Sequence, residues 1–433
     1  MDSPPAILGT GSAEGISPDR HAAARIARPG TGEGTQVLGD PRRGFSTALP
    51  VPGPSEILSA GAQRKSSLHG PWQGDAVQPT GGTVYFVGAG ATRADFPDIP
   101  LMDDLLDQIL RSESTHEILL SFLSDLFGPK CLESAADPHA RPRIDDVFTV
   151  IDASLSGRAP FPGGKSPERL VEVRRHLIAA IGRVIAKTTG EGRGRIAIKF
   201  ARALPDRSSS VISTNYDIVM DNALLERKPG NVNYGVPIRE AVFQSEGLPR
   251  GRFDEIHHFK PLPESQATIK TGNISLLKLN GSLNWLYCPR CDELDITLLQ
   301  GTGALTILDE LELGRCSRQG CTSPYQTLLV GPSLGQRYEH RVLGDIWARA
   351  ERALEKASRL VVIGYSMPEA DYLVRAMMAR TFAHRSQDVT VVTLVNTALD
   401  RHLVEQRFRR LFAECRFELD GFAGFVRRLT GEF

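Results

Sequence analysis

Four cysteines fall into two close pairs whose spacing suits a metal ion. Two residues separate Cys288 from Cys291, and four residues separate Cys316, 25 positions after Cys291, from Cys321. Thiolates at such spacings can fold back on one tetrahedral Zn²⁺ and close its coordination shell. The pattern therefore predicts a structural zinc site that stabilises a small module and performs no chemistry. The alternative is a set of reduced, unliganded thiols.

An amide and a carboxylate lie two residues apart in the segment Ser213–Asp217. In an extended stretch Asn215 and Asp217 project toward the same side. The Asn could hold a ribose hydroxyl or an ordered water, and the Asp could hold a carboxamide. The alternative is that one of them caps a helix running through Val219 and Leu224.

A glycine turn, Gly88–Gly90, follows the short apolar run Thr83–Val87. A turn without bulky side chains lets backbone N–H groups approach a pyrophosphate, with the Thr92 hydroxyl as a further donor. The third glycine of the usual dinucleotide fingerprint is missing, which disfavours a standard Rossmann dehydrogenase. The alternative is a tight connection without a ligand.

Strands and helices must position these residues. Short β-branched or aromatic runs predict five buried strands, and helical patterns separate several of them, which implies an α/β fold with a doubly wound parallel sheet. Ligands bind beyond the carboxyl ends of such strands, and each end here carries small or polar residues. The expected strands are Thr83–Val87, Ser210–Ser213, Leu276–Leu279, Leu360–Ile363 and Val389–Val395, and the helices between them include Ile346–Ala357 and Ala370–Phe382.

Composition narrows the class of protein. The 433 residues are 41% hydrophobic and 24% charged, which is typical of a globular chain. Lys plus Arg (51) equals Asp plus Glu (51), so a nucleic-acid ligand is not indicated. No apolar run approaches the roughly 18 residues of a membrane span, and the start lacks a secretory signal. We expect a soluble, cytoplasmic protein without a membrane partner.

Two long stretches lie outside the predicted strands. Residues 1–82 hold 14 Gly and 10 Pro, which predicts a disordered tail. A transit peptide is the alternative, but interspersed acidic residues disfavour it. Residues 101–195 have a helical pattern without a catalytic cluster, and Ser166 with Pro167 would begin one of these helices. This stretch is expected to be a helical insertion or lid.

Four further residues could be considered for chemistry and are given simpler interpretations. His257 and His258 are expected to be an exposed pair without a fixed partner. Cys131 and Cys415 have no neighbouring cysteine, so they are expected to pack as small apolar residues.

The combined pattern is more specific than any single motif. It consists of Val87–Thr92, Ile212–Asp217, Leu277–Trp285, the four cysteines and Val362–Tyr372. In this order and spacing, which covers about residues 83–400, the chain resembles the sirtuin superfamily, and specifically the bacterial SIR2-like branch associated with defence systems. The resemblance implies a Rossmann-like NAD-binding domain over residues 83–433, with the helical insertion and a zinc ribbon over residues 283–325 inside it.

The resemblance also implies roles for single residues along a bound NAD. The phosphate and ribose path would be lined by Gly88, Ala89, Gly90 and Thr92. The nicotinamide ribose and carboxamide would meet Asn215 and Asp217. The adenosine half would be held by Gly364, Ser366 and Asn396. In the family the first step breaks the bond between nicotinamide and ribose, aided by a fixed ribose and a buried nicotinamide.

The chain departs from the family pattern at one position. In the family a catalytic His immediately precedes the Gly-Ser dipeptide, whereas this chain has Asn280 there. A neutral amide has no accessible pKa for taking a proton from a ribose hydroxyl, so lysine deacylation should be badly impaired. Hydrolysis of NAD depends less on a base at this position, because water can react with the ribose cation and Asp217 could orient that water.

The leading hypothesis is an NAD-consuming defence effector that releases nicotinamide and ADP-ribose, with Asn215, Asp217 and Asn280 as its catalytic positions. A protein partner or self-assembly through the helical insertion would activate it. One alternative is a catalytically impaired sensor that binds NAD or ADP-ribose, which Asn280 favours. Another is an NAD-dependent protein-lysine deacylase, which Asn280 disfavours.

Overall fold

A computed structural model describes the chain over most of residues 81–432. The described ranges are 81–112, 115–133, 141–158, 165–190, 193–205, 209–227, 232–240, 243–245, 259–261, 273–296, 316, 318, 320–334, 340–383, 388–395 and 397–432. All of them belong to the second of the chain's two units, Gly74–Phe433. The prediction of a disordered tail therefore falls outside the described residues, apart from residues 81 and 82. The predictions for His257, His258 and Asn396 also fall outside them.

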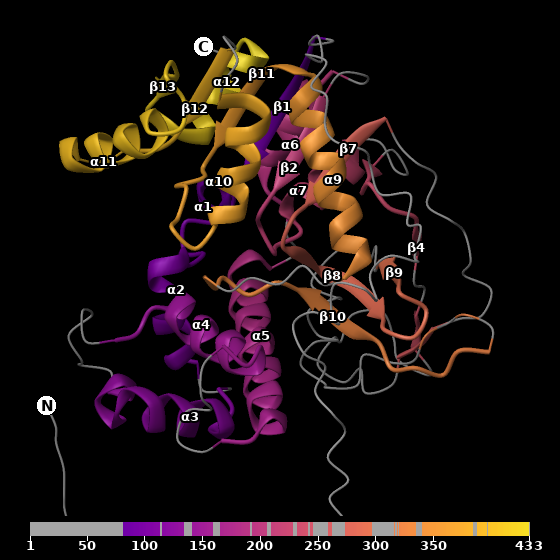
Figure 1. Ribbon diagram of the computed structural model, residues 1–433. Coiled ribbons are helices and arrows are strands. Elements are labelled where there is room, and N and C mark those ends of the chain that lie inside the picture. Colours follow the sequence, from indigo (N-terminus) through magenta and orange to yellow (C-terminus); the bar gives the residue numbers. More distant parts are fainter. Residues whose placement is uncertain are drawn as a thin grey trace, which may run out of the picture. The chain divides into compact units, whose positions relative to one another are not determined.

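Seven strands form the central sheet, in the order β13-β12-β11-β1-β2-β7-β3 with all neighbours parallel (Figure 1). The predicted α/β fold with a doubly wound parallel sheet is confirmed. From β1 the chain builds one half of the sheet through β2, β3 and β7, and it then crosses to β11 on the other side of β1, so the strand order reverses beside β1. The strands are β1 (Gly82–Val87), β2 (Ser209–Ser213), β3 (Val232–Asn233), β7 (Ile274–Lys278), β11 (Ala357–Ile363), β12 (Asp388–Val392) and β13 (Arg416–Glu418).

Helices cover the sheet because successive side chains of a strand point to opposite faces. On β1, the Tyr85 ring packs on Phe200 of α6 with 5.2 Å between centroids, whereas Phe86 packs on Tyr365 at 4.8 Å. One group of helices comprises α1 (Ala89–Asp95), α6 (Arg195–Ala203), α7 (Val219–Arg227) and α12 (Gly421–Thr430). Apart from the helical block described below, the remaining helices are α9 (Arg341–Lys356), α10 (Tyr372–Met378), the π-helix η4 (Ala379–Ala383) and α11 (Ala398–Arg409).

A block of helices separates α1 from α6 in the chain. It comprises α2 (Met102–Leu110), α3 (Glu117–Phe127), the short 3₁₀ helix η1 (Pro129–Leu132), α4 (Ile144–Leu155) and α5 (Pro167–Thr189). The predicted cap is present, since the Ser166 hydroxyl accepts a hydrogen bond from the Arg169 N–H at 3.3 Å and Pro167 opens α5. The role of this block as an insertion or lid stays a prediction. Among the described residues, no helix is both long and apolar enough to cross a membrane.

A second sheet carries the cysteines. Its four strands are arranged in the order β10-β8-β9-β4. All eight residues of β8 are buried, including Trp285, even though Ser282 and Asn284 interrupt its apolar pattern. The strands are β4 (Ile238–Glu240), β8 (Gly281–Cys288), β9 (Glu293–Ile296) and β10 (Gln326–Leu329), and a separate hairpin pairs β5 (Phe243–Ser245) with β6 (Phe259–Pro261).

Two apolar clusters stabilise the two halves of this unit. The larger cluster fills the central sheet and the helices on it. The second joins the helical block to the cysteine-bearing sheet, because Leu283, Leu286 and Cys288 of β8 pack among the apolar residues of α2 to α5. The helical block and the cysteine-bearing sheet thus share one core.

Candidate functional site

The loops that follow the central strands are joined by backbone hydrogen bonds at the carboxyl edge of the sheet. The Gly88 N–H donates to the Ile363 carbonyl at 2.9 Å, and the Thr214 N–H donates to the Val87 carbonyl at 3.2 Å. The loops after β1, β2 and β11 therefore meet at one place. This edge holds most of the residues that the sequence singles out for NAD.

Thr92, Asn215 and Asp217 form a hydrogen-bonded trio at this edge. The Thr92 hydroxyl donates to Asp217 Oδ2 at 2.8 Å and accepts from the Asn215 amide at 3.1 Å. All three residues are buried, with 4%, 8% and 6% of their surface exposed. The trio joins the first turn of α1 to the loop after β2, across 125 residues of chain.

Asp217 also caps a helix, as the alternative interpretation predicted. Its Oδ1 accepts a hydrogen bond from the Val219 N–H at 3.0 Å, where α7 begins. Burial raises the pKa of the Asp217 carboxyl above its ordinary value. The Lys278 ammonium and the hydrogen bonds from Val219 and Thr92 offset part of this increase in pKa. The capping role and a place in the trio are compatible, because they use different carboxylate oxygens.

Lys278 is the last residue of β7, and its side chain contacts the backbone of Asp217, one member of the trio. Its ammonium donates to the Asp217 carbonyl at 2.6 Å, to Asp221 Oδ2 at 2.9 Å and to the Ser282 hydroxyl at 2.5 Å. Asp221 Oδ1 also accepts from the Tyr234 hydroxyl at 3.0 Å. The Lys278 ammonium therefore donates three hydrogen bonds, one of which holds the loop that carries Asp217.

The glycines of the first turn are required by close packing against the loop after β11. A Cβ on Gly90 would lie 2.8 Å from the Gly364 carbonyl oxygen, and one on Gly88 would lie 2.7 Å from the same atom. The Gly90 N–H donates to that carbonyl at 2.8 Å. Gly364 itself has a φ of +60°, and a Cβ there would lie 2.2 Å from the Ala91 nitrogen. The tight connection of the alternative interpretation is therefore present, and Ala89 opens α1 within it.

Asn280 lies at the same edge, on the loop between β7 and β8. It is 5% exposed, and its side-chain amide donates to the Thr214 carbonyl at 3.3 Å. Its own carbonyl accepts from the Val330 N–H at 3.0 Å. The side chain therefore reaches the loop that carries Asn215 and Asp217.

The residues proposed for adenosine are described in part. Gly364 and the exposed Ser366 lie in the loop after β11, and the Ser366 carbonyl accepts from Arg407 at 3.3 Å. Nearby, the Tyr365 hydroxyl donates to Asp371 at 2.9 Å within the buried part of this loop.

The four cysteines of the predicted zinc site come together. Their Sγ atoms all lie within 4.8 Å of one another, which is a separation that one tetrahedral ion can bridge. Two of the distances between the pairs are 3.7 Å, from Cys288 Sγ to Cys321 Sγ, and 3.9 Å, from Cys291 Sγ to Cys316 Sγ. The cluster could bind zinc, and its all-thiolate composition suits a structural site.

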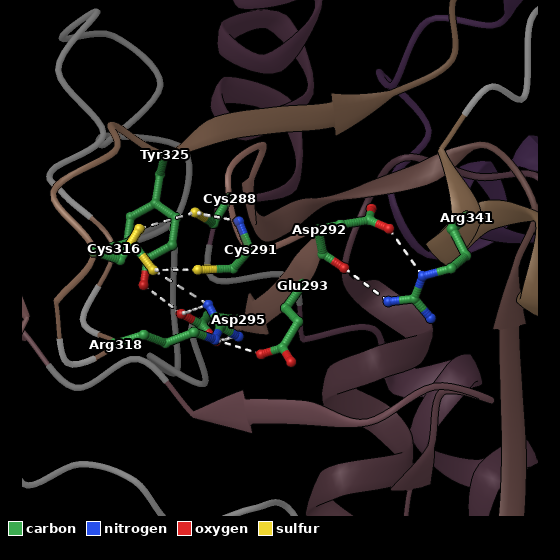
Figure 2. Close-up of polar contacts among 10 residues, drawn as sticks. Cys288, Cys291, Asp292, Glu293, Asp295, Cys316, Arg318, Tyr325 and Arg341 are labelled. Carbon is green, nitrogen blue, oxygen red and sulfur yellow. Dashed lines mark hydrogen bonds and ion pairs between the residues drawn. The ribbon is translucent and has the colours of Figure 1, made fainter.

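Charged and polar side chains surround the cysteine cluster (Figure 2). Arg318 donates to the Cys316 Sγ at 3.4 Å and to Asp295 at 2.8 Å, and it also contacts Glu293. Asp295 is 1% exposed and accepts a hydrogen bond from the Tyr325 hydroxyl. Its burial raises the pKa of the Asp295 carboxyl, while Tyr325 and Arg318 lower it in part. A cation beside a cysteine sulfur favours the thiolate form that a metal requires.

The two remaining cysteines pack as predicted. Cys131 is 2% exposed within the second apolar cluster, and Cys415 packs against the main core.

Sequence reasoning missed Lys278, Asp221 and Tyr234. Lys278 and Asp221 are 57 residues apart in the sequence, so no local pattern indicates that they form a pair. A lysine at the last position of an apolar strand was the available signal, because a buried strand rarely ends in an unpaired charge.

Comparisons with known proteins give a likeness to solved structures only. No family model matches the chain, and no curated protein matches it. A solved structure described as "Structural Basis for the Mechanism and Regulation of Sir2 Enzymes" is 15% identical, with a TM-score of 0.32, and the match covers 81% of this chain and 93% of that one. These values leave membership of a family as a proposal.

Proposed function

We propose that the chain is a SIR2-like protein that binds NAD at the carboxyl edge of the central sheet and hydrolyses it to nicotinamide and ADP-ribose. The observation that supports this most directly is the buried trio of Thr92, Asn215 and Asp217. Its amide and carboxylate lie at the strand ends where doubly wound sheets bind nucleotides. The choice of NAD as the substrate rests on the resemblance of the sequence motifs to the sirtuin superfamily.

The reaction would break the bond between nicotinamide and ribose, form a bond from a water oxygen to the same ribose carbon, and release one proton. Asn215 would hold a ribose hydroxyl, and Asp217 would orient the water or the carboxamide. An ionised carboxylate has about four acceptor positions, so the two hydrogen bonds that Asp217 already accepts leave room for another. A raised pKa also makes this carboxylate a better proton acceptor than an ordinary one.

The rest of the NAD would extend across the edge of the sheet. We propose that Gly88, Ala89 and Gly90 lie along the phosphates, and that the adenosine half contacts Gly364, Ser366 and Asn396. Because Gly88, Gly90 and Gly364 have no side chains, the loops after β1 and β11 can pack directly against each other. This packing fixes the backbone along the carboxyl edge of the sheet.

A second candidate function is a sensor that binds NAD or ADP-ribose without turnover. The specific observation in its favour is Asn280, whose amide donates to the Thr214 carbonyl at 3.3 Å and cannot act as a general base. The same substitution disfavours a protein-lysine deacylase, in which a base at this position activates a ribose hydroxyl.

Nicotinamide release and NAD binding by calorimetry separate these functions. The unchanged chain, Asn215→Ala and Asn280→His are compared, with the exposed Asn273→Ala as the matched control. Hydrolysis by the unchanged chain and by Asn273→Ala, lost in Asn215→Ala, would support the hydrolase. Binding without release, with release gained in Asn280→His, would support the sensor. Absence of NAD binding in the unchanged chain would overturn both functions.

Four further proposals accompany the function. A Zn²⁺ ion at Cys288, Cys291, Cys316 and Cys321 would stabilise the second sheet and supply no chemistry. A defence role, which the resemblance implies, and a cytoplasmic location are also proposed. A protein partner, or self-assembly, would act through the helical block.

A further inference from the structure

A small pocket opens between α9 and the half of the central sheet that contains β2, β7 and β3. Its volume is about 220 Å³. This is below the roughly 300–1,000 Å³ of pockets that hold drug-sized ligands, so a whole dinucleotide would not fit. Its polar lining residues are Ser210, Asn233, Ser275, Arg349, Arg352 and Lys356.

The floor of the pocket is a polar row across three neighbouring strands. Ser210 of β2 is paired in register with Ser275 of β7, which is paired with Asn233 of β3. Residues in register on parallel strands point to the same face. Two positions further along, Ile212 and Leu277 are paired and almost fully buried, as is usual for a parallel sheet covered by a helix. The polar row is therefore a local departure from the apolar pattern.

The wall of the pocket is a basic stripe on α9. Arg349, Arg352 and Lys356 follow one another at spacings of three and four, which places them on one helix face. In the part of the chain that the structure describes, none of the three forms an ion pair, and no carboxylate lines the pocket. By contrast, Arg341 at the start of the same helix is paired with Asp292 at 2.8 Å.

Gly235 keeps the space beside this stripe open. It has a φ of +81°, and a Cβ there would lie 3.0 Å from the Arg349 Cδ and 2.7 Å from the Leu277 side chain. Its conformation is fixed by its N–H, which donates to the Asn233 side chain at 2.9 Å. The stem of Arg349 thus lies beside the glycine, and Arg349 is one of the residues that line the pocket.

We propose that this pocket binds a compact diphosphate group, with the three cations and the hydroxyls of Ser210 and Ser275 as its ligands. Among the described lining residues there are three positive charges and no carboxylate, which matches the charge of such a group, and guanidinium groups bind phosphate oxygens in pairs. The alternative is that the three basic residues are simply exposed to solvent. That alternative does not account for the polar row of Ser210, Ser275 and Asn233 in the sheet beneath them. The pocket lies where β2 and β7 begin, whereas Asn215 and Asp217 follow the end of β2, so it goes beyond the proposed NAD site.

Calorimetric titration with pyrophosphate, and separately with ADP, at low ionic strength tests the proposal. The full chain should bind pyrophosphate at one saturable site, and the double variant Arg349→Gln/Arg352→Gln should bind it about tenfold or more weakly. Tighter binding of ADP than of pyrophosphate would support a nucleoside diphosphate as the source of the group. The reverse order would support free diphosphate.

Two controls make the result specific. Arg410→Gln, which removes an exposed charge at the end of α11, should leave the affinity within about twofold. Asn215→Ala should also retain pyrophosphate binding, whatever its effect on NAD. Absence of saturable binding, equal binding by the double variant, or loss of binding in Asn215→Ala alone would overturn the proposal.

Discussion

Lys278 and Asp221 form an ion pair of 2.9 Å between two side chains that are each only 1% exposed. The ammonium also holds the backbone carbonyl of Asp217, so the same cation connects β7, α7 and the loop of the candidate site. A buried charge is tolerated only when it is paired and hydrogen-bonded, and here each member of the pair has further partners. This contact makes the position of the Asp217 loop depend on residues that do not reach the proposed substrate.

Substitution Lys278→Met should lower the free energy of unfolding by about 3–5 kcal/mol, because it leaves the Asp221 carboxylate buried without its cation. The double variant Lys278→Met/Asp221→Asn should cost less than the sum of the single changes. Urea denaturation measures all three. The matched control is Lys187→Met on the exposed face of α5, which should change stability by about 0.5 kcal/mol or less. A small effect of Lys278→Met would show that the pair is not structural.

Metal analysis should find one zinc ion per chain, because the four Sγ atoms lie within 4.8 Å of one another. Removal of the ion by a chelator should lower the thermal midpoint by about 5 °C or more, since a lost structural site costs several kcal/mol. Cys288→Ser should lose the metal, whereas Cys131→Ser, at a buried cysteine outside the cluster, should retain it. A chain that is free of metal and equally stable would contradict the zinc proposal.

Substitution Gly364→Ala should destabilise the protein by about 3 kcal/mol or more. The new Cβ would lie 2.2 Å from the Ala91 nitrogen, and the backbone at Gly364 has a positive φ. The matched change Gly344→Ala, inside α9 with no atom within 4 Å of the added Cβ, should stabilise by about 1 kcal/mol. Both are measured by chemical denaturation. Equal effects of the two changes would show that the loops after β1 and β11 are not tightly packed.

Much of the fold could be predicted from local pattern. The five predicted strands are present because short runs of β-branched and aromatic residues, such as Thr83–Val87, specify a buried strand by themselves. Ser166 with Pro167 likewise specified the start of α5. Strand β8 was missed because Ser282 and Asn284 occupy buried positions where local pattern requires apolar residues. The Ser282 hydroxyl accepts from the Lys278 ammonium and donates to the Asn284 side chain, and these hydrogen bonds compensate for its burial.

The sequence by itself determined which residues could take part in chemistry. The spacing of the four cysteines predicted their convergence, and Asn215 and Asp217 were identified from their place after a strand. Tertiary structure alone decided what those residues contact. Asp217 meets Thr92 across 125 residues, and the glycines of the first turn pack closely against Gly364. Such contacts depend on strands that are distant in sequence and adjacent in the sheet, so no local pattern of residue types encodes them.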